Sequence, residues 1–78
     1  MITKVKKYLK TLSKEEIKEL VNHPDLTEIE RWLIFYTFAE KRMVINTCFK
    51  LGLSEPQFYI TKRIALTKLY YILDLKTI

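Results

Sequence analysis

Apolar residues recur near the start of the chain at the three- and four-residue spacing of an amphipathic helix. The first apolar stripe consists of Ile2, Val5, Leu9 and Leu12. It predicts a short helix whose other faces carry lysines. Ser13, with Glu16 three residues later, matches a capping box and predicts the start of a second helix. Asn22-His23-Pro24 is expected to end that helix, because the residue before a proline disfavours helical backbone.

A second capping box predicts a third helix in the middle of the chain. Thr27 and Glu30 have the required spacing, and the helix is expected to continue to about residue 41. Its apolar residues point in nearly all directions: Ile29, Trp32, Leu33, Ile34, Phe35, Tyr36 and Phe38. Such a helix is normally central in a core, and a small domain is not expected to cover it on every side. We therefore expect part of the aromatic set Phe35, Tyr36 and Phe38 to contact a partner protein or a second copy.

Two further helices follow, separated by the chain's single glycine. The inward residues expected for the first of them are Val44, Ile45, Cys48 and Leu51. Gly52 can adopt the left-handed conformation that ends this helix. Ser54 and Gln57 form a third capping box, which tolerates Pro56 in the first turn. The last helix is expected to extend to about residue 75, with an apolar stripe of Phe58, Thr61, Ala65, Leu69 and Ile72.

The pattern as a whole predicts an all-α fold, a small bundle of about five helices. Residues 1–24 are expected to form an N-terminal helical extension, and residues 25–78 the main domain. Within that domain, residues 44–69 have the layout of a helix-turn-helix, whose second helix enters the major groove of DNA. Glycine turns also join helices in bundles of other kinds, so the layout alone favours DNA binding without establishing it.

Charge is distributed unevenly along the chain. The formal net charge is +5, and residues 41–78 alone carry seven Lys and Arg against two acids, which also gives +5 (7 − 2). A basic half favours a polyanionic partner such as nucleic acid, and a solvated basic surface is the alternative. The lysines near the N-terminus are expected to form a solvated face, with contact to flanking DNA as the alternative: Lys4, Lys6, Lys7 and Lys10.

Composition excludes several classes of function. One Cys, one His and one Gly do not suffice for a disulfide framework, a zinc finger or a glycine-rich phosphate loop. We therefore expect no enzyme, no cofactor and no metal site, with Cys48 as a small core residue. Lysines interrupt the N-terminal apolar run, and no run approaches the roughly 20 residues of a membrane span. The expected location is the cytoplasm, without membrane contact.

Three blocks of the sequence resemble region 4 of bacterial sigma-70-type factors. Leu26-Thr27-Glu28-Ile29-Glu30-Arg31-Trp32-Leu33 is similar to the L-T-x-x-E-R-x-x-L/I opening of that domain. The segment from Val44 to Ser54 is similar to its first motif helix and turn, and Ile64-Ala65-Leu66-Thr67-Lys68-Leu69 to the A-L-x-K-L ending of its recognition helix. Phage late transcriptional regulators of the ArpU type have a similar ending. The resemblance covers about residues 26–73.

The resemblance implies a small transcriptional regulator that binds double-stranded promoter DNA, with possible contact to RNA polymerase. The implied DNA-binding residues are Thr47, Lys50, Ser54, Gln57, Tyr59, Lys62, Arg63 and Lys68. Arg63 could bind a guanine edge and Gln57 an adenine edge, because both side chains suit bidentate base contacts. Lys50, Lys62 and Lys68, with Lys41 and Arg42, would neutralise phosphates, while Thr47 and Tyr59 would donate hydrogen bonds to them.

Pro56 and Ile60 depart from this pattern, because they place side chains without hydrogen-bonding groups near the groove-facing side. They motivate an alternative hypothesis from another class of function. In it, the chain is a protein-interaction module that binds RNA polymerase or another regulator without reading DNA. The aromatic set Phe35, Tyr36 and Phe38 would then supply the contact.

Overall fold

Side-chain caps fix where three of the helices begin, as the sequence predicts. A computed structural model describes residues 2–74 of the chain. Its elements are α1 (Ile2–Lys10), α2 (Lys14–Val21), α3 (Glu28–Ile34), η1 (Phe35–Ala39), α4 (Val44–Leu51) and α5 (Glu55–Ile72). Ser13, Thr27 and Ser54 each cap a helix, and each capping box is formed in both directions. Residues 2–74 contain five α-helices and no strand, which confirms the all-α prediction.

The third helix changes its hydrogen bonding halfway, which the sequence did not predict. α3 ends at Ile34, and the chain continues as the π-helical segment η1, in which Glu40 N donates to Phe35 O over 3.1 Å. A π-turn takes one residue more than an α-turn. Lys41 then adopts a positive φ of 53° and ends the helical path. No proline or glycine between residues 27 and 41 marks the change, so the apolar spacing alone suggested one continuous α-helix.

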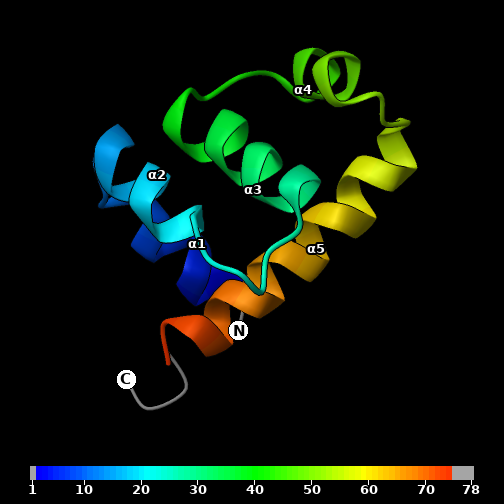
Figure 1. Cartoon of the computed structure of the whole chain (residues 1–78). Helices are drawn as coiled ribbons and strands as arrows, with labels where there is room; N and C mark the ends of the chain where they lie inside the picture. The colour runs from blue at the N-terminus through cyan, green and yellow to red at the C-terminus, as the bar shows by residue number, and fades with distance from the viewer. Residues whose placement is uncertain (1, 75–78) are drawn as a thin grey trace.

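α5 is the longest helix and supports the others (Figure 1). α1 and α3 both pack against it, while α4 packs against its beginning and α2 packs against η1. The segment 1–24 thus contributes α1 directly to the central packing. α5 ends at Ile72, and the end predicted near residue 75 lies outside the described residues. No helix within residues 2–74 combines the length and apolar character needed to cross a membrane.

One apolar cluster holds the helices together. Its buried members are Val5, Leu9, Ile17, Val21, Leu26, Leu33, Ile34, Phe35, Phe58, Ala65, Leu66 and Leu69. The prediction for α4 was wrong at one position: Ile45 is 71% exposed, and Thr47 is fully buried instead. Val44, Cys48 and Leu51 do pack against the core. Ile45 is displaced from Val44 by one residue, which turns it about 100° around the helix and away from that face.

Candidate nucleic-acid interface

The turn between α4 and α5 has the backbone that its sequence predicts. Gly52 has a φ of 68°, in the left-handed region, and its N–H donates to the Cys48 carbonyl. Leu53 N donates to the same carbonyl over 3.0 Å. The first turns of α5 then expose Glu55, Pro56, Gln57, Tyr59 and Ile60. The beginning of α5 therefore faces solvent, where a ligand can reach it.

The Gln57 side chain is engaged at the helix cap. Its Oε1 accepts a hydrogen bond from Ser54 N over 2.8 Å, while the Ser54 hydroxyl accepts one from Gln57 N over 3.3 Å. A bidentate adenine contact needs both the oxygen and the nitrogen of the amide. The expected adenine contact by Gln57 is therefore incompatible with the cap that the structure contains.

Thr47 lies in the interior and not at the expected interface. Its side chain is fully buried, and its hydroxyl has no hydrogen-bond partner within the described residues. The prediction that Thr47 donates to a phosphate is wrong for this conformation, because no ligand can reach the hydroxyl. Helical spacing explains the placement, since Thr47 lies three residues after Val44 on the inner face of α4.

Lys68 forms an internal ion pair and is not a free cation. Its Nζ donates to Glu30 Oε1 over 2.8 Å, and the same oxygen accepts a hydrogen bond from Thr27 N over 2.8 Å. Glu30 is only 5% exposed. Burial by itself would raise the pKa of Glu30, but the bonds from Lys68 and Thr27 outweigh it and the pKa lies below its ordinary value. Lys68 therefore neutralises a buried carboxylate, and its predicted contact with a phosphate would compete with this ion pair.

Lys62 lies against aromatic rings at the boundary of the core. Its ammonium group is 5.8 Å from the ring centroid of Phe38 and 5.9 Å from that of Phe58. Burial lowers the pKa of Lys62, and the positive charge of Lys6 on α1 lowers it further. Lys62 forms no ion pair within residues 2–74. Its charge is thus partly desolvated and lacks a neutralising acid.

Five of the predicted DNA-binding residues are exposed, and three of these have side chains outside the helix cap: Lys50, Tyr59 and Arg63. Arg63 and Tyr59 lie one turn apart on α5. Lys50 is near the end of α4, with its ammonium group 5.4 Å from the Tyr36 ring centroid. The accessible part of the predicted site thus consists of one arginine, one phenol and one lysine, with Lys62 at its edge.

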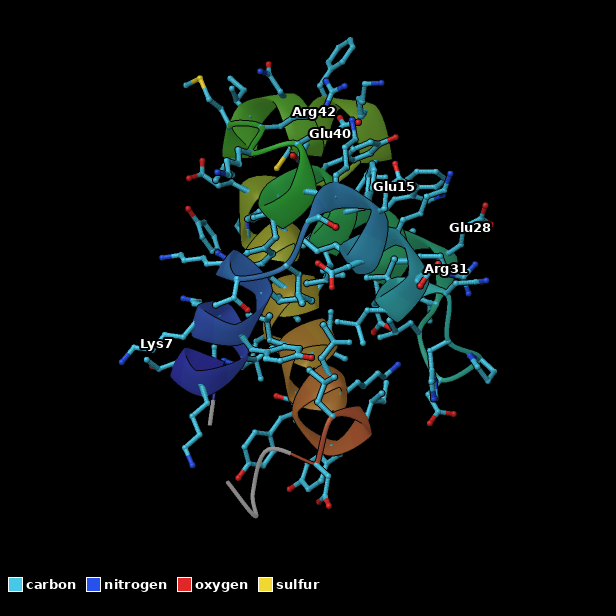
Figure 2. All side chains as sticks on the ribbon, turned by 90° about the vertical axis from the view of Figure 1, so that its left-hand side faces the viewer. Lys7, Glu15, Glu28, Arg31, Glu40 and Arg42 are labelled. Atoms are coloured by element: carbon cyan, nitrogen blue, oxygen red, sulfur yellow. The ribbon has the colours of Figure 1, made fainter. Side chains whose placement is uncertain are left out.

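A hollow of about 270 Å³ lies where α1 packs against α5. We call it the α1–α5 hollow; its lining residues are Ile2, Lys6, Tyr59, Lys62, Arg63 and Leu66. From the sequence, Lys6 was expected on a solvated face with the neighbouring lysines. Lys6 lies four residues after Ile2, however, and so borders the apolar stripe of α1. That spacing is the signal that separates Lys6 from Lys7, which points away from the bundle (Figure 2).

The aromatic set expected to meet a partner is mostly covered by the chain itself. Phe35 is 8% exposed and belongs to the core, so the prediction that it contacts a partner is wrong. Tyr36 is partly buried, stacked on Trp32 with ring centroids 5.5 Å apart. Phe38 is partly buried beneath Lys62. All three residues belong to η1, the π-helical segment that the sequence did not predict.

A different apolar surface is exposed, on the outer side of α4. Phe49 is 91% exposed and Ile45, one turn earlier, is 71% exposed, with Met43 exposed just before the helix. We call these three residues the α4 apolar face. This face was not predicted from the sequence, because Ile45 was expected in the core and Phe49 had no expected role. Reading the helix with Val44, Thr47, Cys48 and Leu51 as its inner side would have placed Ile45 and Phe49 outside.

The described part of the chain contains no group of three or more His, Cys, Asp or Glu side chains placed to hold a metal ion. The accessible side chains of the candidate interface are mainly cations, phenols and apolar groups, with Glu55 at the beginning of α5. These groups can bind anions or apolar surfaces. A comparison with known protein families, with curated proteins and with solved structures finds no match.

Proposed function

We propose that this chain binds double-stranded DNA through a helix-turn-helix formed by α4, the Gly52 turn and α5. The observation that carries the proposal is the exposed beginning of α5, which follows a left-handed glycine turn and leads to Arg63 and the unpaired Lys62. α1 and the part of α5 after Glu55 contain seven Lys and Arg and no acid. This distribution favours a polyanionic ligand on that side of the molecule.

In this proposal, the chain holds the DNA backbone more than it reads base sequence. Phosphate contacts fix position without carrying sequence information, whereas base contacts require free hydrogen-bonding groups. Gln57 is engaged at its cap, and Pro56 and Ile60 have no polar side-chain atoms. Arg63 is the exposed side chain of α5 that can bind a guanine edge in the bidentate manner. Strong discrimination between sequences is therefore not expected.

Several residues of the two outer blocks that resemble sigma region 4 make contacts within the fold. Glu30 belongs to the first block and Lys68 to the last, and these two side chains form a partly buried ion pair. Arg31, also in the first block, donates through Nε to the Val21 carbonyl over 3.0 Å at the end of α2. These residues stabilise the fold, so a role in DNA binding rests on the exposed residues between the two blocks.

Fluorescence anisotropy with a labelled duplex at several salt concentrations tests the proposal. Affinity should fall steeply as salt increases, because bound phosphates release counterions. Arg63→Ala should weaken binding by about tenfold, the effect of losing a bidentate base contact or a phosphate contact. Lys7→Ala is the matched control, since Lys7 points away from the bundle (Figure 2). The absence of binding at about 50 mM salt, where electrostatic binding is strong, would remove the proposal.

The α4 apolar face favours a second candidate function, binding to RNA polymerase or to another transcription regulator. A phenylalanine that is 91% exposed, one turn from an exposed isoleucine, is unusual on a surface without a partner. Phe49→Ser should abolish binding to purified bacterial RNA polymerase, measured by biolayer interferometry, and leave DNA affinity unchanged. Thr3→Ser, at an exposed position on α1, serves as a surface control. Equal polymerase binding by Phe49→Ser and the unchanged protein would contradict this second function.

A further inference from the structure

The α1–α5 hollow brings together positive charges from opposite ends of the chain. Lys6 comes from α1, whereas Lys62 and Arg63 come from the middle of α5. Lys6 and Lys62 are close enough for the charge of Lys6 to lower the pKa of Lys62. Like charges repel, so this arrangement is unfavourable in the folded chain, and a bound anion would reduce the repulsion.

No acid within residues 2–74 forms an ion pair with Lys6, Lys62 or Arg63. Three other cations do have acidic partners: Lys68 pairs with Glu30, and Lys14 and Arg42 both pair with Glu40. Glu28 projects from the side of the molecule opposite to Lys7 (Figure 2). The cations of the hollow therefore have no acidic partner from the described chain, and a negatively charged ligand could neutralise them.

The hollow also contains groups that suit a phosphate better than a simple ion. The guanidinium of an arginine matches two phosphate oxygens, and an ammonium group binds as a point charge. Tyr59 lines the hollow with a phenol, which can donate a hydrogen bond to a third oxygen. Ile2 and Leu66 provide apolar lining beside these groups, which strengthens electrostatic contacts by excluding water.

We infer that the α1–α5 hollow is a phosphate-binding site, in which Lys6 of α1 completes a cationic set with Lys62 and Arg63. The ligand is a phosphodiester group of duplex DNA, and this source of phosphate rests on the proposed function. α1 is then part of the nucleic-acid interface as well as of the core. The site extends that interface from the beginning of α5 along the helix toward α1.

Two neighbouring substitutions on α1 separate this inference from general electrostatic attraction. Lys6→Met removes the charge in the hollow and keeps most of the apolar stem, whereas Lys7→Met removes the same charge on the outward face. Both variants should remain folded by circular dichroism, because neither lysine forms an ion pair within the described residues. Binding to a labelled 20-base-pair duplex is then measured from about 50 to 200 mM salt.

The expected result is a smaller salt dependence for Lys6→Met alone. Loss of one phosphate contact should reduce the slope of log affinity against log salt by about 0.9, and Lys7→Met should keep the original slope. If the unchanged protein binds DNA and both variants keep its slope, the inference is overturned and the proposed function stands. Equal reductions in both variants would also overturn it, because the effect would then reflect net charge.

A second measurement distinguishes binding of DNA from binding of free phosphate. Melting temperatures are compared in sodium phosphate and in sodium chloride of equal ionic strength, with each of the three proteins. The melting temperatures of the unchanged protein and of Lys7→Met should be higher in phosphate than in chloride. This difference should be lost in Lys6→Met, because a ligand stabilises only a state that binds it. If DNA does not bind but this pattern is found, the hollow is a site for free phosphate and the proposed function fails. If neither DNA nor phosphate has an effect, both the site and the function are overturned.

Discussion

Two lysines on α5 lie in contact zones between packed helices, which we call seams. The two seams differ in electrostatic character. Lys68 is in the seam between α3 and α5, where it donates to the buried carboxylate of Glu30 over 2.8 Å. Lys62 is in the seam between α1 and α5, where burial and the positive charge of Lys6 both lower its pKa. The two residues have the same side chain and lie six positions apart on one helix. Their roles differ because of the residues that other helices bring to them.

The comparison teaches that a basic helix is not uniformly available to a ligand. A lysine that neutralises a buried acid contributes to folding, and its charge cannot also serve a phosphate without exposing that acid. A lysine beside another cation contributes little to folding and keeps its charge for a ligand. Of the cations on α5, Lys68 therefore belongs to the fold, whereas Lys62 and Arg63 belong to the surface that we propose binds DNA.

The largest effect is expected from Lys68→Met, which breaks the first seam. The substitution leaves the Glu30 carboxylate buried with the Thr27 N–H as its remaining partner. Breaking a fully buried pair costs about 3–5 kcal/mol, and we expect about 2 kcal/mol because the Lys68 side chain is 34% exposed. Urea denaturation measures the change in the free energy of unfolding. Lys62→Met is the matched control, and an equal loss in both variants would contradict the distinction between the seams.

Acid should weaken the first seam through Glu30. Its folded-state pKa lies below the ordinary value of 4.5, so its contribution to stability is fully present above that value. The contribution is lost as the pH falls through the folded-state pKa, because the unfolded chain binds the proton more readily. Thermal melts between neutral pH and pH 3 should show this loss, which should be smaller in Glu30→Gln. The exposed Glu16 and the partly buried Glu40, whose pKa values are also lowered, will leave some acid sensitivity in that variant.

Removing the repulsion in the second seam should have a smaller effect of opposite sign. Lys6→Met separates Lys62 from its like-charged neighbour and leaves Lys62 over the two phenylalanine rings. We expect the free energy of unfolding to rise by about 0.5 kcal/mol, as for a partly screened pair near the surface. Urea denaturation of Lys6→Met and Lys7→Met provides the measurement. A loss of stability specific to Lys6→Met would show that Lys6 contributes more by packing than it costs by charge.

Raising the salt concentration tests the same difference between the two seams, and the expected change in stability is the smallest of the four. Raising sodium chloride from about 0.05 to 0.5 M screens exposed charges more than buried ones. The repulsion between Lys6 and Lys62 should weaken, while the pair of Lys68 with the buried Glu30 should persist. We expect the unchanged protein to gain a few tenths of a kcal/mol of stability, measured by urea denaturation, and Lys6→Met to gain less. An equal gain in both proteins would place the salt effect outside this seam.

Local features of the fold could be predicted from the sequence, because their causes lie within a few residues. The capping residues Ser13, Thr27 and Ser54 act over three positions, and Gly52 acts through its own φ. The five helices and the buried stripe of α1 follow from these signals and from apolar spacing. In α4, the apolar spacing was compatible with either of two faces as the inner one. The face that includes Ile45 was expected to be buried, and this expectation was wrong.

The candidate site was harder to predict because its geometry depends on distant segments. Nothing near Lys68 in the sequence indicates an acid partner, since Glu30 is 38 residues away. Lys6 likewise meets Lys62 only after α1 packs on α5. Exposed Arg63 and Tyr59 were correctly placed on the surface, whereas Thr47 and Gln57 were assigned contacts that burial and capping prevent. Pairing between helices decided the outcomes for Lys68 and Lys6, whereas the Gln57 cap and the inward position of Thr47 follow from spacing within α5 and α4.

The π-helical segment η1 has a geometric consequence for the whole molecule. Each residue of an α-helix turns the chain by about 100°, so one extra residue within a turn changes the direction in which the chain leaves the helix. Phe35–Ala39 thus acts as an angular spacer that sets where Lys41 and Arg42 carry the backbone toward α4. Deleting one residue from this spacer would rotate the departure point. The deletion would change the orientation of α4 and of its apolar face relative to α5.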